Sequence, residues 1–181
     1  AVTDEVAFSG KQSLKIQDAP GLTHAYNPHF TFGCAFSNTV VENRFAVRMG
    51  AGAEFYTEWR DYPDAGGNDY RVGPCLVFRD GKIIARTRTA RADGVLGVAE
   101  RVVAELPVDT WAQVTVTATL GSGDAGRWSV TVARAGQPPA TVAELRMLHA
   151  KFEAMEWLGV CSTATRATVY YLDDFAFGEK R

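Results

Sequence analysis

The chain has 181 residues with 19 Lys and Arg against 21 Asp and Glu, a formal net charge of −2. Hydrophobic residues make up 46% and charged residues 22%, which excludes intrinsic disorder and gives no basic surface for nucleic acid. No apolar run approaches the roughly 18 residues of a membrane helix. This length can bury a sizeable core, so we expect one domain over residues 1–181. Because it begins at Ala1 rather than Met, we interpret it as a trimmed or processed module.

Apolar and polar residues alternate with period two along most of the chain, the pattern of half-buried β-strands. The pattern is clearest in Trp111–Leu120 and recurs in Arg127–Arg134, and the Gly-rich residues 121–124 between them predict a hairpin. In chain order, the further strands are expected at Gln12–Gln17, His29–Phe36, Arg44–Met49, Ala53–Arg60, Tyr70–Phe78, Lys82–Thr87, Arg101–Glu105, Glu156–Ser162 and Thr168–Phe177. Many short strands with Gly-rich turns predict an all-β fold, a two-sheet antiparallel β-sandwich or jelly roll.

Three segments lack this alternation. Helical periodicity occurs near Ala143–Phe152, in a stretch too short to change the fold class. Asp61–Asp69 and Thr89–Ala99 carry Gly, Asp or Asn without periodicity, so we expect loops there. Long loops at the rim of a sandwich are where binding residues concentrate.

A second hairpin is predicted where Gly50-Ala51-Gly52 joins Arg44–Met49 to Ala53–Arg60. A three-residue loop would place opposite charges across the two strands, at about 0.2–1 kcal/mol for each pair. The expected pairs are Arg48 with Glu54, Arg44 with Glu58, and Glu42 with Arg60. The resulting polar face, with Tyr56 between the charges, suits a polar ligand such as a sugar.

The cysteines and tryptophans are interpreted mainly as core residues. Cys34, Cys75 and Cys161 are odd in number and lie in strand-like contexts, so we expect small buried thiols, with a disulfide between two of them as the alternative. No Cys-x-x-Cys occurs, which argues against a zinc site. We expect Trp59, Trp111 and Trp128 in the core, whereas Trp157 can be placed on either face.

The ends of the chain resemble carbohydrate-binding modules with a β-sandwich fold. Phe8–Ile16 and Tyr170–Phe175 are similar to the first and last strands of such modules. Asp109-Thr110-Trp111 and Gly126–Val130 resemble concanavalin A-like and laminin-G-like jelly rolls. Sandwiches of this kind serve as lectins, binding modules, glycosidases and polysaccharide lyases.

The central residues Glu58-Trp59-Arg60-Asp61 and Tyr70–Pro74 are similar to domains attached to large secreted bacterial polysaccharide-processing proteins. This resemblance implies a non-catalytic module that binds a polysaccharide or oligosaccharide. It also implies a secreted, extracellular or periplasmic location within a larger protein that has other domains. No nucleic-acid or membrane partner is expected.

Sugar recognition needs an aromatic ring for the C–H face of a pyranose and polar groups for its hydroxyls. Tyr26 and Tyr62 are further exposed aromatic candidates. The expected ligand-binding residues are Glu54, Tyr56, Glu58, Arg60, Tyr70, Arg71, Asn68 and His29.

The resemblance also implies a structural Ca²⁺ between the first and last strands, built from a strand carboxylate and backbone carbonyls. Asp173 is the expected ligand, with Asp4 or Glu5 as its partner. The alternative is a carboxylate that accepts hydrogen bonds from loop amides.

Catalysis is the alternative to binding. Glycosidases need two carboxyl groups about 5–9.5 Å apart, whereas Glu54 and Glu58 lie on one strand roughly 13 Å apart at about 3.3 Å per residue. A polysaccharide lyase fits better, because it needs a Tyr or His base and an Arg, Asn or Gln to neutralise a uronate. The third hypothesis is a structural or interaction domain without glycan affinity.

Overall fold

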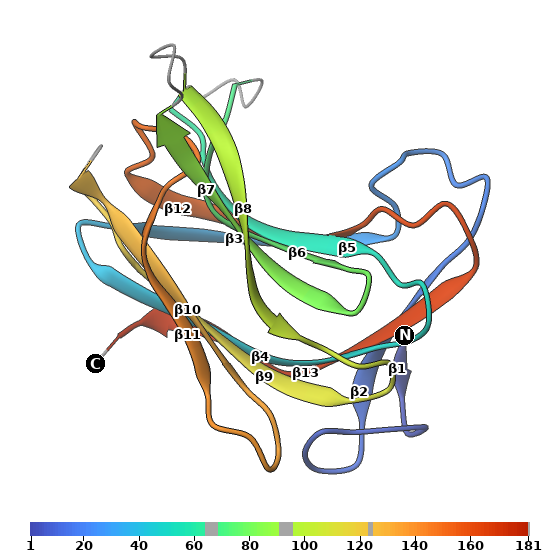
Figure 1. Cartoon of the computed structure of the whole chain (residues 1–181). Coiled ribbons are helices and arrows are strands. Elements are labelled where there is room, and N and C mark those ends of the chain that lie inside the picture. The colour runs from blue at the N-terminus through green and yellow to red at the C-terminus, as the bar shows by residue number, and fades with distance from the viewer. Residues whose placement is uncertain (64–68, 91–95, 123–124, 181) are drawn as a thin grey trace.

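The computed structural model describes residues 1–63, 69–90, 96–122 and 125–180. Its regular elements are all β-strands, arranged in two antiparallel sheets that lie one above the other (Figure 1). This confirms the prediction of an all-β, two-sheet antiparallel sandwich. Among the described residues, no helix is long and apolar enough to cross a membrane.

The larger sheet has seven strands within the described part of the chain, in the order β1-β2-β13-β4-β9-β10-β11. Their bounds are β1 Val2–Thr3, β2 Ser13–Asp18, β13 Thr168–Glu179, β4 Val40–Met49, β9 Trp111–Thr119, β10 Arg127–Ala133 and β11 Ala140–Arg146. The predicted first and last strands are neighbours in this sheet, because β2 pairs with β13. The hairpin predicted from the Gly-rich residues 121–124 is confirmed by the antiparallel pairing of β9 with β10.

The smaller sheet has six strands within the described residues, in the order β3-β12-β5-β6-β7-β8. Their bounds are β3 His29–Ser37, β12 Ala154–Ser162, β5 Phe55–Asp61, β6 Arg71–Arg79, β7 Lys82–Ala90 and β8 Leu96–Glu105. At one side of this sheet, neighbouring strands come from distant parts of the sequence, since β12 lies between β3 and β5.

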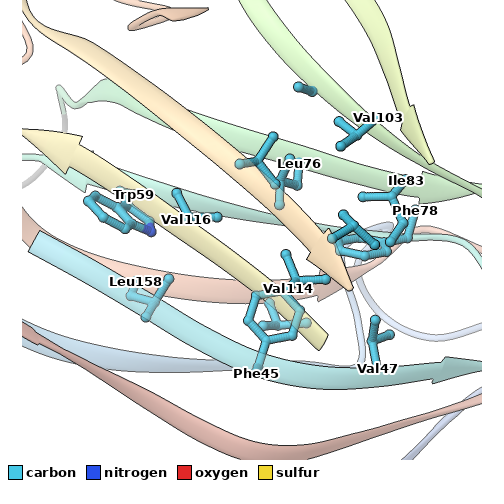
Figure 2. Close-up of a cluster of buried hydrophobic side chains, with 14 of the residues drawn as sticks. Phe45, Val47, Trp59, Leu76, Phe78, Ile83, Val103, Val114, Val116 and Leu158 are labelled. Atoms are coloured by element: carbon cyan, nitrogen blue, oxygen red, sulfur yellow. The ribbon is translucent and has the colours of Figure 1, made fainter. Parts of the chain in front are cut away.

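The core lies between the two sheets. Figure 2 shows Phe45 of β4 and Val114 of β9 in the same layer of side chains as Trp59 of β5 and Leu158 of β12. Trp59 and Trp128 are buried as predicted. Trp111 is half-buried instead, because it pairs with Arg48 on the outer side of the larger sheet and contacts Phe8.

The predicted hairpin between β4 and β5 is wrong. β4 pairs with β13 and β9 in the larger sheet, whereas β5 pairs with β12 and β6 in the smaller one. The chain crosses between the sheets because Phe45 and Phe55 must both face the shared core. Gly50 stabilises this connection between the sheets, because its N–H donates to the Val169 carbonyl at 2.9 Å. A Cβ at residue 50 would lie 2.6 Å from that oxygen, so this close approach requires glycine.

Consequently none of the three expected cross-strand charge pairs forms. Arg48 instead lies 3.1 Å from Asp109, measured from Nη2 to Oδ1, and Glu42 pairs with Lys180. Arg44 pairs in register with Thr115 and Ala176.

Two other expectations also need correction. The helical periodicity near Ala143–Phe152 is misleading, because β11 pairs with β10 as a strand across residues 140–146. The loop expected at Thr89–Ala99 is shorter, since β7 continues to Ala90 and β8 begins at Leu96. Pairing between these two strands extends them toward the rim of the sheet.

Candidate functional site

The candidate site lies on the outer face of the smaller sheet. Alternation along β5 turns Trp59 toward the core and places Tyr56, Glu58 and Arg60 on the opposite face. Residues paired across antiparallel strands share a face, so Arg60 lies beside Trp157 and Tyr56 beside Cys161. The prediction that Tyr56, Glu58 and Arg60 share one face is therefore correct, although the hairpin that suggested it does not form.

A cavity of about 420 Å³ opens on this face. Its lining comes from β3, β5 and β12 and from the segments preceding β3 and β6: Tyr26, His29, Thr31, Tyr56, Arg60, Tyr70, Trp157 and Cys161. The structure thus brings together four of the expected ligand-binding residues, namely His29, Tyr56, Arg60 and Tyr70.

Arg60 is held between two aromatic rings. Its guanidinium carbon lies 4.1 Å from the centroid of the Tyr70 ring and 4.1 Å from that of Trp157. These are cation–π distances. The Trp157 ring folds back over Gly159, where a Cβ would lie 2.0 Å from the nearest ring atom. Gly159 therefore provides the space in which the indole lies under the guanidinium.

Glu58 neutralises the same guanidinium. Arg60 Nε donates to Glu58 Oε1 at 2.7 Å, and Nη2 lies 2.6 Å from the same oxygen. Burial opposes the charged form, but the hydrogen bond with Tyr62 and the charge of Glu58 outweigh it, so the pKa of Arg60 is raised. Glu58 is only 9% exposed, so this ion pair is largely shielded from solvent.

Tyr56 presents a hydroxyl that stays protonated. Burial raises its pKa, and the hydrogen bond with Cys161 and the charge of Glu58 act in the same direction. Burial also raises the pKa of the Cys161 thiol. Neither group supplies an anion at neutral pH, so both act as neutral hydrogen-bonding groups. All three cysteines are free; Cys75 and Cys161 are buried as expected, whereas Cys34 is half-buried.

The mouth of the cavity carries an aromatic and imidazole cluster. The rings of Tyr26 and His24 stack with their centroids 4.9 Å apart, and His29 meets the Tyr26 ring edge-on at 5.3 Å. His29 Nδ1 lies 2.8 Å from Asn27 Oδ1. Because an amide oxygen only accepts, Nδ1–H donates, which leaves Nε2 as an acceptor in the neutral ring.

Other expected ligand residues lie elsewhere. Glu54 contacts Arg166 at 3.4 Å, and Glu58 contacts Arg60 without lining the cavity. Arg71 donates to the Lys151 carbonyl at 2.9 Å and pairs with Asp61 at 3.6 Å, away from the cavity. Asn68 lies outside the described residues.

Trp157, Thr31 and Cys161 belong to the site although they were absent from the expected set. A signal for two of them is present in the sequence of β12, where period two puts Trp157, Gly159 and Cys161 on one face. Their pairing with β5 depends on a contact between distant segments.

Of the three residues expected to bind calcium, Asp173 and Glu5 are engaged with other groups, and Asp4 is exposed. Asp173 Oδ2 accepts the backbone N–H groups of Phe8 at 2.8 Å and Ser9 at 3.1 Å, while Oδ1 accepts that of Asp174 at 2.8 Å. Glu5 binds the Lys15 ammonium and the Tyr171 hydroxyl. No group of three or more His, Cys, Asp or Glu side chains among the described residues could hold a metal. This donor set does not fit Ca²⁺ as arranged, and calcium stays a prediction.

No protein-family model and no curated protein matches the chain. Solved structures share its fold. The endo-β-1,4-glucuronan lyase of the fungus Trichoderma reesei superposes with a TM-score of 0.65 at 13% identity, covering 99% of this chain and 86% of that enzyme. The marine PL-14 alginate lyase of Aplysia kurodai superposes with a TM-score of 0.69 at 12% sequence identity, covering 99% of this chain and 87% of that enzyme.

A conserved carbohydrate esterase of a Shiga toxin-encoding bacteriophage gives a TM-score of 0.56 at 13% identity, covering 100% of this chain and 87% of that chain. The chain therefore has the jelly-roll sandwich fold that its sequence resembles. Lyases and an esterase share this fold, so the fold by itself assigns no chemistry.

Proposed function

We propose that this protein is a non-catalytic carbohydrate-binding module that holds a sugar unit of a polysaccharide in the cavity on the smaller sheet. The stack of Tyr70, Arg60 and Trp157 in the cavity wall carries the proposal. Aromatic surface receives the C–H face of a pyranose, and the neighbouring hydroxyl and imidazole groups hydrogen-bond its hydroxyls. The volume of about 420 Å³ is within the usual range of small-ligand sites.

A glycan array followed by affinity electrophoresis tests this proposal. We expect retention by at least one polysaccharide, with Trp157→Ala weakening it. Phe8→Ala is the matched control, since Phe8 is an aromatic residue packed on Trp111, which belongs to the larger sheet. An absence of retention on every glycan would instead favour a structural or interaction domain.

A polysaccharide lyase is the second candidate. Tyr56, His29 and Arg60 line one cavity, and two of the solved structures with this fold are lyases of uronic-acid polymers. A lyase must remove a proton next to a uronate whose charge is neutralised. Two observations weigh against it, because burial raises the pKa of Tyr56 and Glu58 already neutralises Arg60.

Incubation with uronic-acid polysaccharides distinguishes these candidates. A lyase generates unsaturated products that absorb in the ultraviolet, whereas a binding module leaves the absorbance unchanged. A glycosidase is disfavoured further, since no carboxylate is among the described residues that line the cavity.

The proposal includes a cellular setting. The resemblance of residues 58–61 and 70–74 to domains of secreted polysaccharide-processing proteins supports a secreted, extracellular or periplasmic location. Other domains of such a protein would be the covalent partners of this module. Fractionation of the producing cells tests the location.

A further inference from the structure

We infer that the cavity selects uncharged sugars over uronates and that Glu58 is the residue that determines this selectivity. This inference rests on the proposed carbohydrate-binding function and specifies its substrate class. It is carried by the contacts of Arg60, the group in the lining that would attract a carboxylate.

Arg60 is the one charged group among the described residues lining the cavity, with His29 counted as neutral. Its charge is already matched by Glu58, whose Oε1 receives both Nε and Nη2 of the guanidinium at 2.7 and 2.6 Å. The pair leaves no net charge at the cavity wall. The other lining groups are hydroxyl, thiol, imidazole and indole groups, which suit the hydroxyls and C–H bonds of a neutral sugar.

The geometry restricts access to Arg60 as well. The rings of Tyr70 and Trp157 each lie with their centroid 4.1 Å from the guanidinium carbon, and Glu58 Oε1 contacts both Nε and Nη2. A uronate that replaced Glu58 would leave a carboxylate that is 9% exposed without its cation. A uronate that joined Glu58 would place two like charges together in a partly desolvated site. Either route is costly.

Two arginines farther across the same face share one carboxylate. Arg79 and Arg86 both lie near Glu100, at 2.5 and 3.7 Å respectively. These side chains belong to β6, β7 and β8, so contacts between arginine and glutamate continue beyond the cavity, whereas Arg60 at the cavity is paired one to one with Glu58.

The test uses matched glycans that differ in oxidation at C6: β-1,4-glucan with β-1,4-glucuronan, mannan with polymannuronate, and galactan with polygalacturonate. Dissociation constants are measured for the wild-type protein and for Glu58→Gln. The substitution keeps the shape of the side chain and removes the negative charge that neutralises Arg60. Glu42→Gln is the matched control, because Glu42 lies on the larger sheet and pairs with Lys180.

We expect the wild-type protein to bind the neutral member of a pair on the order of tenfold more tightly than the oxidised member. Glu58→Gln should raise affinity for the oxidised member by a similar factor and leave neutral affinity within about twofold. Glu42→Gln should change neither affinity.

Tighter wild-type binding of the oxidised member would overturn the inference while leaving the carbohydrate-binding function standing. An equal gain in Glu42→Gln and Glu58→Gln would assign selectivity to the overall charge and so remove the role of Glu58. Binding of no glycan by the folded wild-type protein would reject the proposed function and, with it, the inference.

Discussion

Arg60 and Trp157 occupy directly paired positions on β5 and β12, and the guanidinium carbon of Arg60 lies 4.1 Å from the indole centroid. Two contacts with Glu58 and one with the Tyr70 ring also hold this guanidinium in place. The cavity wall is therefore arranged before a ligand arrives. A wall built in this way spares the ligand the cost of ordering flexible side chains.

Replacing Tyr70 tests the aromatic wall. Tyr70 is 43% exposed, so Tyr70→Ala should lower the melting temperature little. Loss of the ring should weaken glycan binding on the order of fivefold to tenfold, because the sugar and Arg60 both lose an aromatic face. Isothermal titration calorimetry measures the affinity. Phe8→Ala, at a residue that is 41% exposed and packed on Trp111 of the larger sheet, should bind normally, and unchanged binding by Tyr70→Ala would reject this role.

Gly159→Ala tests the position of the indole. A Cβ at residue 159 would lie 2.0 Å from the Trp157 ring, so the indole cannot keep the position in which it contacts Arg60. We expect a fall in glycan affinity, a changed tryptophan emission spectrum and a loss of stability of about 1 kcal/mol.

Gly33→Ala provides the matched control, since Gly33 pairs with Trp157 from the other side and a Cβ there meets nothing within 4 Å. Equal glycan affinities of Gly159→Ala and Gly33→Ala would show that the position of the indole over Gly159 does not matter for binding.

The sandwich could be predicted from the sequence because period-two alternation is a local signal. The alternation of Val114 and Val116 with Thr115 and Thr117 marks both the strand and its buried face. In β11 the alternation predicts a strand less clearly, since buried and exposed residues alternate only in part of it. Helical periodicity in a short segment therefore competes with the strand pattern there.

The pairing of strands could not be predicted in the same way. Gly50-Ala51-Gly52 is a suitable hairpin loop, and the charges of the flanking strands fit an antiparallel ladder. Both strands, however, have an apolar face, and facing sheets bury both faces at once. The sequence contains no local signal for that crossing. The site residue Trp157 was missed for the same reason, because its partner Arg60 is on a strand distant in sequence.

Asp18→Asn should stabilise the protein at neutral pH. Asp18 is 4% exposed, its Oδ1 accepts the Ala19 N–H, and Oδ2 has no partner among the described residues. Thr168 is paired with Asp18 across β13 and β2, and its hydroxyl also has no hydrogen-bond partner among the described residues. Burial penalises the charged carboxylate, and an amide of the same shape has no charge to desolvate, so we expect a gain of about 1 kcal/mol in unfolding free energy.

The pH dependence checks the cause. Burial raises the pKa of Asp18, so the folded state binds its proton more tightly than the unfolded state does. The free energy of unfolding should then fall as the pH rises from below the unfolded pKa of about 3.9 through the raised folded value. Urea titrations at several pH values should show this fall as the difference in unfolding free energy between the wild-type protein and Asp18→Asn. Asp4→Asn, at an exposed position, is the control, and an identical pH profile for all three proteins would contradict the prediction.

Two experiments together test the calcium prediction: removal of Ca²⁺ by EDTA and substitution of Asp173. Three backbone N–H groups already satisfy this carboxylate, so we expect EDTA to leave the unfolding midpoint unchanged. Asp173→Ala should nevertheless lose about 1–2 kcal/mol, because the amides of Phe8, Ser9 and Asp174 lose a charged acceptor. A structural ion would behave differently: stability would rise with free Ca²⁺ as RT ln(1 + [L]/Kd), by about 2.7 kcal/mol at a hundredfold excess over Kd, and Asp173→Ala would abolish that rise. Thermal unfolding across a Ca²⁺ series, starting from metal-loaded protein, separates the two outcomes because only the ion makes the midpoint depend on concentration.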